Sequence, residues 1–153
     1  MTCVIQRVKS ASVAVEGEVV GSCEQGLLLL LGVWQGDSEK DADVLAAKIA
    51  KLRIFVDENG KMNRSVNDIG GSILAISNFT LCAAYKHGNR PEYISAEKPM
   101  RANELYEYFV LQLRKLVEGG VACGKFGANM QITTHLDGPV TITMDSHVLT
   151  GVV

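Results

Sequence analysis

Apolar residues dominate two short stretches of the chain that have the length of a strand. Residues 27–33 form an apolar run bracketed by Gly26 and Gly36, and residues 72–77 follow the Gly70-Gly71 pair. A run of seven residues is too short for a membrane span and is typical of a strand buried on both faces. The pattern therefore predicts a central strand at 27–33 and another strand at 72–77.

Alternating apolar and polar residues predict strands at both ends of the chain. Residues 2–15 alternate in part, and a turn at 16–18 leads into Val19 and Val20, which indicates a strand pair. Residues 130–136 and 140–144 alternate on either side of Asp137-Gly138, which predicts a terminal hairpin. A short strand at 53–56 with a turn at 57–60 completes the predicted strands.

Two segments have apolar residues at helical spacing. Ser38 and Asp41 have the spacing of a capping box, and the residues after them predict a helix over 38–53. A second helix is predicted over 101–117, because Leu105 and Phe109 begin an apolar face that runs to its end. Residues 81–100 between them have no clear period, so they predict a long loop, and such loops are more often functional than idle.

These elements together predict the fold class. Strands outnumber helices, and they do not alternate with helices in a regular βαβ rhythm. We therefore expect an α/β protein of the mixed α+β kind, with a strongly curved, barrel-like sheet and two main helices. No repeat, linker or low-complexity tract interrupts residues 1–153, which we interpret as a single domain.

Composition and charge exclude several classes of protein. The chain has 153 residues and a net charge of -2, so it has no global basic field, and a nucleic-acid partner would have to be met locally. Its four cysteines form no C-x-x-C pair, which argues against a structural metal site and favours reduced thiols. Because the sequence also lacks a targeting segment and an apolar stretch of roughly 18 residues, we expect a cytoplasmic protein without membrane or metal.

The usual catalytic motifs are missing from the sequence. Ser77 does not lie in a G-x-S-x-G elbow, which disfavours a Ser-His-Asp triad. His87 and His135 lie in polar surroundings and are interpreted as solvated residues, and Cys82 as a buried apolar group. Gly70-Gly71 lacks the lysine and the spacing of a phosphate-binding loop.

Two segments are unusual for another reason. Residues 77–81 end a buried strand in small polar groups and backbone amides, and residues 137–141 place a proline where a strand begins. Taken singly, the two segments are interpreted as a strand end and a hairpin turn. Taken with other parts of the chain, they match a family.

The chain resembles the D-aminoacyl-tRNA deacylases (D-tyrosyl-tRNA deacylases) over nearly its whole length. Many ordered matches carry this resemblance: Gln6-Arg7-Val8, Arg53-Ile54-Phe55, Gly60-Lys61-Met62-Asn63, Gly70-Gly71, Ser77-Asn78-Phe79-Thr80-Leu81, Gly88-Asn89-Arg90-Pro91, Leu105-Tyr106, Gly124-Lys125-Phe126-Gly127, Met130 and Asp137-Gly138-Pro139-Val140-Thr141. One position departs from the family pattern, because Asn78 stands where the family has glutamine. Asparagine keeps the carboxamide but shortens its reach by one methylene, so its hydrogen bond to substrate is expected to be longer or mediated by water.

The resemblance implies an esterase without a cofactor. Members of this family hydrolyse the ester that joins a D-amino acid to the terminal adenosine of tRNA, and many also remove glycine. It implies a catalytic segment of Ser77, Asn78, Phe79 and Thr80, in which backbone amides around Phe79 and Thr80 stabilise the oxyanion. The adenosine's own 2′-hydroxyl helps to activate the water. Thr80 is then a positioning residue, with a role as nucleophile as the alternative.

The resemblance also implies how the substrate is bound. The Gly138-Pro139 peptide bond is cis in the family and enters the active site of the other subunit, where its carbonyls exclude an L side chain. By the same resemblance Arg7 is expected to hold this motif from below, and Phe126 and Met130 to enclose the adenine. The implied partners are aminoacylated tRNA and a second copy of the chain, with active sites at the interface of a homodimer. The competing hypothesis is an RNA- or ligand-binding module whose chemistry Asn78 has weakened.

Overall fold

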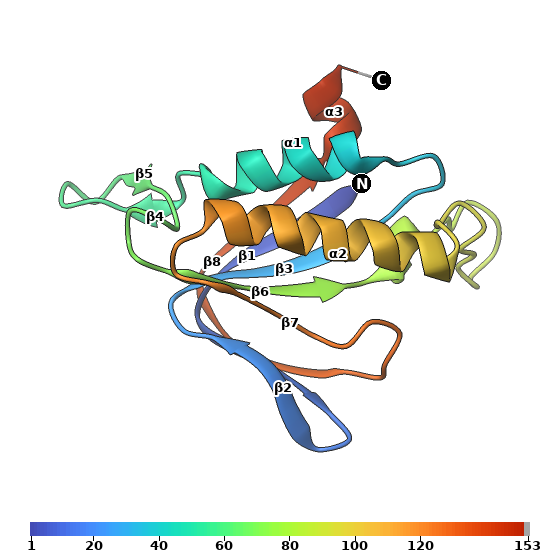
Figure 1. The fold of residues 1–153 in the computed structure, drawn as a ribbon, viewed down its shortest axis with the longest axis horizontal. Coiled ribbons are helices and arrows are strands. Elements are labelled where there is room, and N and C mark those ends of the chain that lie inside the picture. The colour runs from blue at the N-terminus through green and yellow to red at the C-terminus, as the bar shows by residue number, and fades with distance from the viewer. Residues whose placement is uncertain (152–153) are drawn as a thin grey trace.

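Two helices lie side by side over one face of a curved sheet in the computed structural model, which describes residues 1–151 (Figure 1). The strands of this sheet run in the order β2 (Glu18–Cys23), β1 (Thr2–Val15), β3 (Gly26–Gly32), β6 (Ser72–Ser77) and β7 (Val121–Cys123), and β8 (Gln131–Asp145) pairs with β1. The helices over the sheet are α1 (Glu39–Ala50) and α2 (Pro99–Leu116). The mixed α+β class, the barrel-like sheet and the two main helices are confirmed.

β3 is the central strand, as its apolar run predicted. It pairs antiparallel with β1 on one side and parallel with β6 on the other. The parallel pairing requires a crossover connection, which α1 provides. Because β3 and β6 end side by side, the segments that follow them leave the sheet at the same edge.

The two predicted helices are present and bury the faces that the sequence indicated. Ser38 and Asp41 form the capping box of α1, with the Ser38 amide donating to Asp41 Oδ2 at 2.9 Å. Leu45 of α1 and Phe109 of α2 are fully buried in the core between helices and sheet. A smaller core, which includes Val13 and Leu74, fills the concave side of the sheet.

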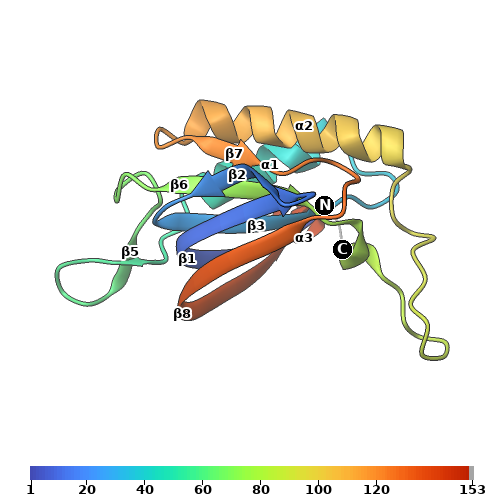
Figure 2. The ribbon, with the colours of Figure 1, turned by 90° about the horizontal axis from the view of Figure 1, so that it is seen from below.

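The sheet curls until β2 approaches β7 from the far side (Figure 2). At this crossing a Cβ atom on Gly21 would lie 2.4 Å from the carbonyl oxygen of Cys123, a distance that backbone atoms cannot accommodate. Only glycine therefore allows the two strands to come this close. This contact brings the sheet near to closure as a barrel.

The predicted terminal hairpin is wrong, because residues 131–145 form one continuous strand. β8 runs antiparallel to β1 along its whole length, from Thr2 opposite Asp145 to Ala14 opposite Gln131. The register shifts between Gln6 and Val8, where residues 137–140 of β8 bulge out opposite Arg7 alone. A bulge and a hairpin turn share their sequence signals, and only pairing with a distant strand distinguishes them.

Several smaller elements differ from the sequence prediction. The strand predicted at 53–56 is shortened to β4 (Phe55–Val56), which pairs with the unpredicted β5 (Met62–Arg64). Within residues 81–100, the structure has the end of the 3₁₀ helix η1 (Phe79–Cys82). The chain's described part closes with a short helix, α3 (Ser146–Thr150), which the sequence analysis missed. None of the helices within residues 1–151 is long and apolar enough to cross a membrane.

Candidate active site

A cavity of about 810 Å³ lies at the edge of the sheet where β6 ends. Its lining includes Ile76 near the end of β6 and residues from η1, from 93–98, from the start of α2 and from 126–130 before β8. Six of the nine residues predicted for the site line it: Ser77, Asn78, Phe79, Thr80, Phe126 and Met130. The structure therefore brings together two motifs about fifty residues apart in the sequence.

The first wall of the cavity is the turn that leaves β6. The Asn78 amide still donates to Leu31 of β3 at 2.8 Å, and the chain then turns into η1. The first amides of a helix have no acceptor within it. The amides of Phe79 and Thr80 occupy these positions, so the turn presents backbone donors beside the cavity.

The Asn78 side chain is hydrogen-bonded to the threonine two residues later. The Thr80 hydroxyl donates to Asn78 Oδ1 at 2.6 Å. The bond fixes the orientation of both side chains at the rim of the cavity. It also directs the Thr80 proton to an amide oxygen, which is not a base that could activate the hydroxyl. This geometry favours a positioning role for Thr80 over a nucleophilic one.

A second part of the cavity lining carries Phe126 and Met130. Phe126 is half-buried, and its ring centroid lies 6.2 Å from that of Tyr106 in α2. Tyr106 is itself buried and donates from its hydroxyl to the Ala75 carbonyl of β6 at 2.8 Å. Since burial also raises the pKa of Tyr106, this phenol stays neutral. Tyr106 thus connects the wall that carries Phe126 to the strand that ends in Ser77.

Several lining residues were not predicted as site residues, among them Tyr93, Glu97, Lys98 and Pro99. These four lie within residues 81–100, which the sequence marked only as a functional loop. The Tyr93 ring meets that of Phe79 edge-on, with 5.1 Å between centroids. Phe79 is 56% exposed, so the contact with Tyr93 holds a largely solvent-exposed side chain in place at the cavity.

The side chains considered as conventional nucleophiles or bases lie elsewhere. Cys82 is buried with its thiol on the Val33 carbonyl at 3.4 Å, and burial raises its pKa to about 11. His87 and His135 are exposed, as expected of solvated residues. No histidine of the described chain lines the cavity around Ser77, so a Ser-His-Asp triad is not assembled there.

Gly138 and Pro139 do not line this cavity. They lie in the bulge of β8, both are exposed, and the peptide bond between them is cis. Arg7 supports the bulge: its guanidinium donates to the Asp137 carbonyl at 3.1 Å and to the Ile54 carbonyl at 2.7 Å. Its Nε also pairs with the Asp137 carboxylate at 3.3 Å. Three of the predicted site residues thus form a second group, separate from the cavity.

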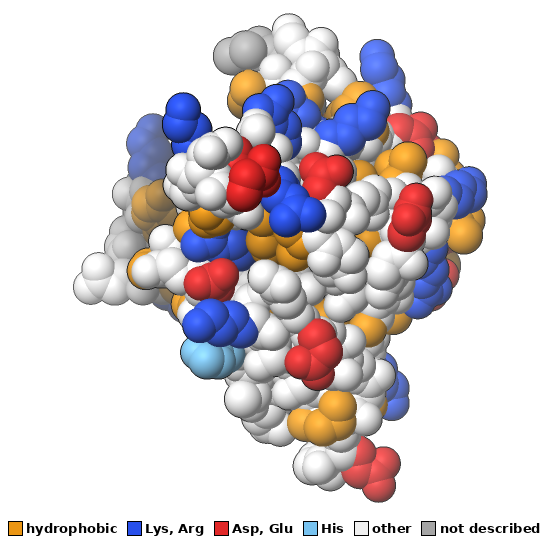
Figure 3. All heavy atoms as spheres, turned by 90° about the vertical axis from the view of Figure 1, so that its left-hand side faces the viewer, with side chains coloured by type: hydrophobic (Ala, Val, Ile, Leu, Met, Phe, Trp, Pro, Cys, Tyr) orange, Lys and Arg blue, Asp and Glu red, His pale blue; other side chains and the backbone are white. Residues whose placement is uncertain are grey.

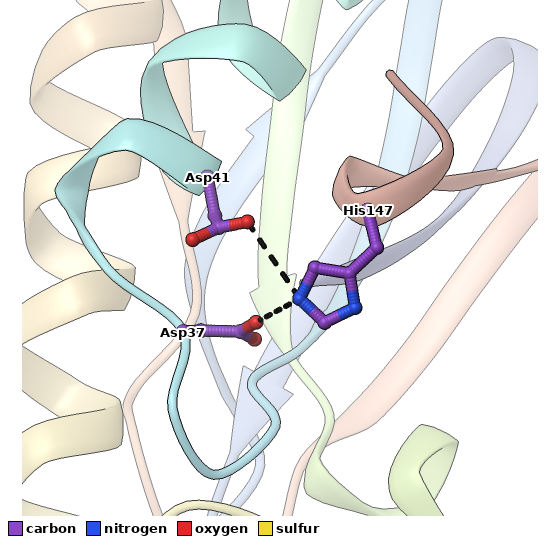
Figure 4. A group of neighbouring side chains, drawn as sticks. All are labelled: Asp37, Asp41 and His147. Atoms are coloured by element: carbon purple, nitrogen blue, oxygen red, sulfur yellow. Dashed lines mark hydrogen bonds and ion pairs between the residues drawn. The ribbon is translucent and has the colours of Figure 1, made fainter. Parts of the chain in front are cut away.

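A polar cluster that the sequence analysis missed joins the starts of α1 and α3. Asp37, Asp41 and His147 place one ligand-type atom each within 4.8 Å of one another (Figure 4). His147 Nε2 lies 3.0 Å from Asp37 Oδ1 and 3.8 Å from Asp41 Oδ1. His147 is more than a hundred positions from Asp37 and Asp41, so no local spacing could have revealed the cluster.

Protein groups already occupy the carboxylates of this cluster. Asp37 Oδ2 lies 2.8 Å from the Met1 ammonium and accepts from the Trp34 amide at 2.7 Å. Asp41 Oδ1 accepts from the Ser146 hydroxyl at 2.7 Å. Such a network accounts for the buried charges without an ion. That the reaction needs no metal stays a prediction, checked by the rate in excess chelator.

Comparisons with known proteins agree with the resemblance. A sequence profile of the family described as D-Tyr-tRNA(Tyr) deacylase matches residues 4–145. A protein of Koribacter versatilis named D-aminoacyl-tRNA deacylase is 54% identical over 95% of this chain and 97% of its own. One of the same name from Ruegeria pomeroyi is 54% identical over 95% of this chain and 99% of its own.

Solved structures share the fold. The c-Myc DNA Unwinding Element Binding Protein superposes with a TM-score of 0.89 and 40% identity, over 95% of this chain and 98% of the other. A probable eukaryotic D-amino acid tRNA deacylase superposes with a TM-score of 0.81 over 95% of this chain and all of the other. At 14% identity, the second comparison shows likeness of fold alone.

Proposed function

Since the chain belongs to the D-Tyr-tRNA(Tyr) deacylase family and hydrolyses the ester of D-aminoacyl-tRNA, we propose that it does so in the cavity between η1 and residues 126–130. The observation that carries this proposal is the cavity itself, because it joins the 77–80 segment to Phe126 and Met130. Charging of tRNA takes place in the cytoplasm, and we place the protein there.

The chemistry follows from the substrate. An aminoacyl ester is already activated, so an enzyme can hydrolyse it by positioning a water and stabilising the tetrahedral oxyanion. In this proposal the amides of Phe79 and Thr80 donate to the oxyanion. The 2′-hydroxyl of the terminal adenosine helps to activate the water, which explains why the cavity needs no histidine.

The adenine is proposed to lie between Phe126 and Met130. An aromatic ring pairs with the face of any base, and both side chains are half-buried on one wall of the cavity. The ester would then point towards η1. Glycine esters are also expected to be hydrolysed, because glycine has no side chain for a steric filter to reject.

Stereochemical selection is proposed to come from a second copy of the chain. Gly138 and Pro139 are exposed on β8, whose outer edge is unpaired in the part of the chain that the structure describes. A long unpaired strand edge is a ready surface for association with another chain. In a homodimer, the motif of one protomer would enter the cavity of its partner, where main-chain carbonyls exclude any L side chain.

Hydrolysis of matched D- and L-aminoacyl-tRNA tests this function. The protein is expected to release the D-amino acid well above the spontaneous rate and to leave the L-ester intact. Sedimentation at the assay concentration is expected to show a dimer. Equal rates on the two esters would reject the steric filter, and full activity of a strict monomer would reject the composite site.

Replacing Asn78 tests the role of its carboxamide. Asn78→Ala is expected to lower kcat/KM by the equivalent of about 1–3 kcal/mol, the cost of an orphaned hydrogen-bond partner, because the Thr80 hydroxyl loses its acceptor. Asn78→Gln should leave kcat/KM unchanged or raise it modestly. A markedly faster Asn78→Gln variant would instead mean that the carboxamide touches the substrate.

Replacing Thr80 distinguishes the two roles assigned to it. Thr80→Val keeps the shape but removes the hydroxyl, and it is expected to lower kcat far less than the many-thousandfold loss that follows removal of a nucleophile. Single-turnover kinetics on D-aminoacyl-tRNA provide the measurement. A folded, dimeric and wholly inactive Thr80→Val protein would establish Thr80 as the attacking group.

Replacing Phe126 tests the adenine site. Phe126→Ala is expected to weaken kcat/KM by about 1–3 kcal/mol, the range for stacking of one base on one aromatic ring. Phe126→Trp retains a ring and should retain most of the activity. If Phe126→Ala and Phe126→Trp behave alike, the adenine does not stack there.

A further inference from the structure

A short arm projects from the chain beside the cavity. Residues 84–92, which we call the basic arm, leave η1 and return before Tyr93. Two backbone hydrogen bonds between Ala84 and Glu92, of 2.8 and 2.9 Å, close its base, and Gly88 turns its tip with a φ of +71°. Residues 85–91 are all exposed, so the arm has a defined base and an open tip.

The arm carries positive charge without compensation along its tip. Lys86 and Arg90 are its two cations, and residues 85–91 contain no Asp or Glu; the nearest acid is Glu92 at the base. Neither cation forms an ion pair with a residue of the described chain. Tyr85, 79% exposed, adds an aromatic face to the same surface.

The opposite end of the molecule has a different charge pattern. Its face, which includes the β4–β5 end, mixes basic and acidic side chains (Figures 1 and 3). Arg53 there is bonded to Asn63, and Arg64 to the Asp68 carbonyl. A surface of mixed sign attracts a polyanion weakly, whereas an arm of one sign can hold phosphates.

The arm leads directly into a residue of the cavity wall. Tyr93, the residue after the arm, lines the cavity and contacts Phe79. Figure 2 shows the arm as a yellow-green loop that projects beyond the start of α2. If the terminal adenosine of a tRNA lies in the cavity, the nucleotides that precede it must leave across the edge of the cavity. The arm provides unpaired cations near that edge.

We propose that Lys86 and Arg90 of the basic arm bind the phosphates of the single-stranded 3′ end of tRNA that precede the terminal adenosine. The proposal rests on the proposed function and deepens it, since the cavity would hold the ester and the arm the strand that leads to it. Phosphate contacts of this kind fix register without reading sequence, which suits an enzyme that must accept many tRNAs. Tyr85 would provide a stacking face for one base.

A double charge reversal, Lys86→Glu with Arg90→Glu, tests the proposal against a matched control. The control is Lys51→Glu with Lys61→Glu, which changes the net charge equally at two exposed lysines outside the arm and the cavity. Two esters are compared: D-aminoacyl-tRNA, and a D-aminoacyl ester of adenosine that has no phosphate. Anisotropy with uncharged tRNA measures binding independently of catalysis.

The arm variant is expected to lower the ratio of kcat/KM for tRNA to that for the adenosine ester by at least tenfold. Its affinity for uncharged tRNA should fall similarly, and the slope of log affinity against log salt should become shallower by roughly 0.7 per lost contact. The control variant should leave the ratio, the affinity and the salt slope unchanged.

Three outcomes would overturn the proposal. The first is an unchanged ratio of the two kcat/KM values. The second is an equal loss of kcat/KM on both esters, which would mean that the arm shapes the cavity. The third is a changed sedimentation coefficient, which would mean that the arm contacts another protein chain. Failure of the proposed function looks different: the unaltered protein would hydrolyse neither ester. In that case, a loss of tRNA affinity in the arm variant would still support phosphate binding by Lys86 and Arg90.

Discussion

Arg7→Ala is expected to lower the free energy of unfolding by about 3 kcal/mol, the lower end of the range for breaking a buried ion pair. The Arg7 side chain is 10% exposed, and its loss leaves the Ile54 carbonyl without its donor and the Asp137 carboxylate without its cation. The lower end applies because the Asp137 side chain is 30% exposed and water can solvate it in part. Urea denaturation provides the measurement.

The same substitution is expected to reduce stereochemical selection. Arg7 donates to the backbone of the bulge that carries Gly138 and Pro139, so its removal should let the L-ester be hydrolysed faster relative to the D-ester. Arg7→Lys keeps the charge but cannot bond both carbonyls, and it should recover only part of either loss. Arg53→Ala, at an exposed arginine, is the control and should change stability by less than about 0.5 kcal/mol. If the Arg7→Ala protein were destabilised but still selected D- over L-esters as before, Arg7 would contribute to stability and not to stereochemical selection.

Tyr106→Ala is expected to cost about 3–5 kcal/mol of stability, as for other large aromatic residues removed from a core. Tyr106 is 4% exposed, and its ring packs near Phe126 while its hydroxyl bonds Ala75. Tyr106→Phe removes the hydroxyl alone and should cost about 1 kcal/mol. The expected order of unfolding midpoints is unaltered protein, then Tyr106→Phe, then Tyr106→Ala.

Tyr85→Ala is the matched control, because its ring is 79% exposed and contributes little to the core. Tyr106→Phe should also keep most of the deacylase activity, since its ring still supports Phe126. If Tyr106→Phe were as unstable as Tyr106→Ala, the hydrogen bond to β6 rather than the packing of the ring would govern this region.

The parts of the fold that sequence reasoning predicted well are those with a strong local pattern. The apolar run of β3 and the capping box of α1 depend on residues near one another, and the structure has both. The hairpin failed because the alternation on both sides of Gly138 belongs to one strand, and the partner that keeps it straight is β1, more than a hundred residues away. Long-range pairing of this kind is not encoded in a local turn signal.

The same distinction between local and long-range signals applies to the site residues. The residues themselves mark the 77–81 and 137–141 segments as unusual, but the roles of these segments follow only from the family resemblance. Tyr93 and Ala96 were missed because an aperiodic loop gives no sign of which side chains face inward. The cluster of Asp37, Asp41 and His147 was missed because α1 and α3 meet only through the tertiary fold.

The bulge in β8 also restricts how the length of this strand can change in evolution. From Thr2 to Ser10, β1 advances eight residues, while β8 advances ten, from Asp145 to His135. The excess is even, so side chains on both halves of β8 keep the same faces relative to β1. Loss of one residue from 137–140 would turn one half of the strand inside out. Loss of two would keep both halves facing as they do and delete the Gly-Pro projection, and the second register shift, between Val8 and Ser10, would remain. Natural insertions and deletions are therefore expected to avoid residues 137–140 and to gather in the loops.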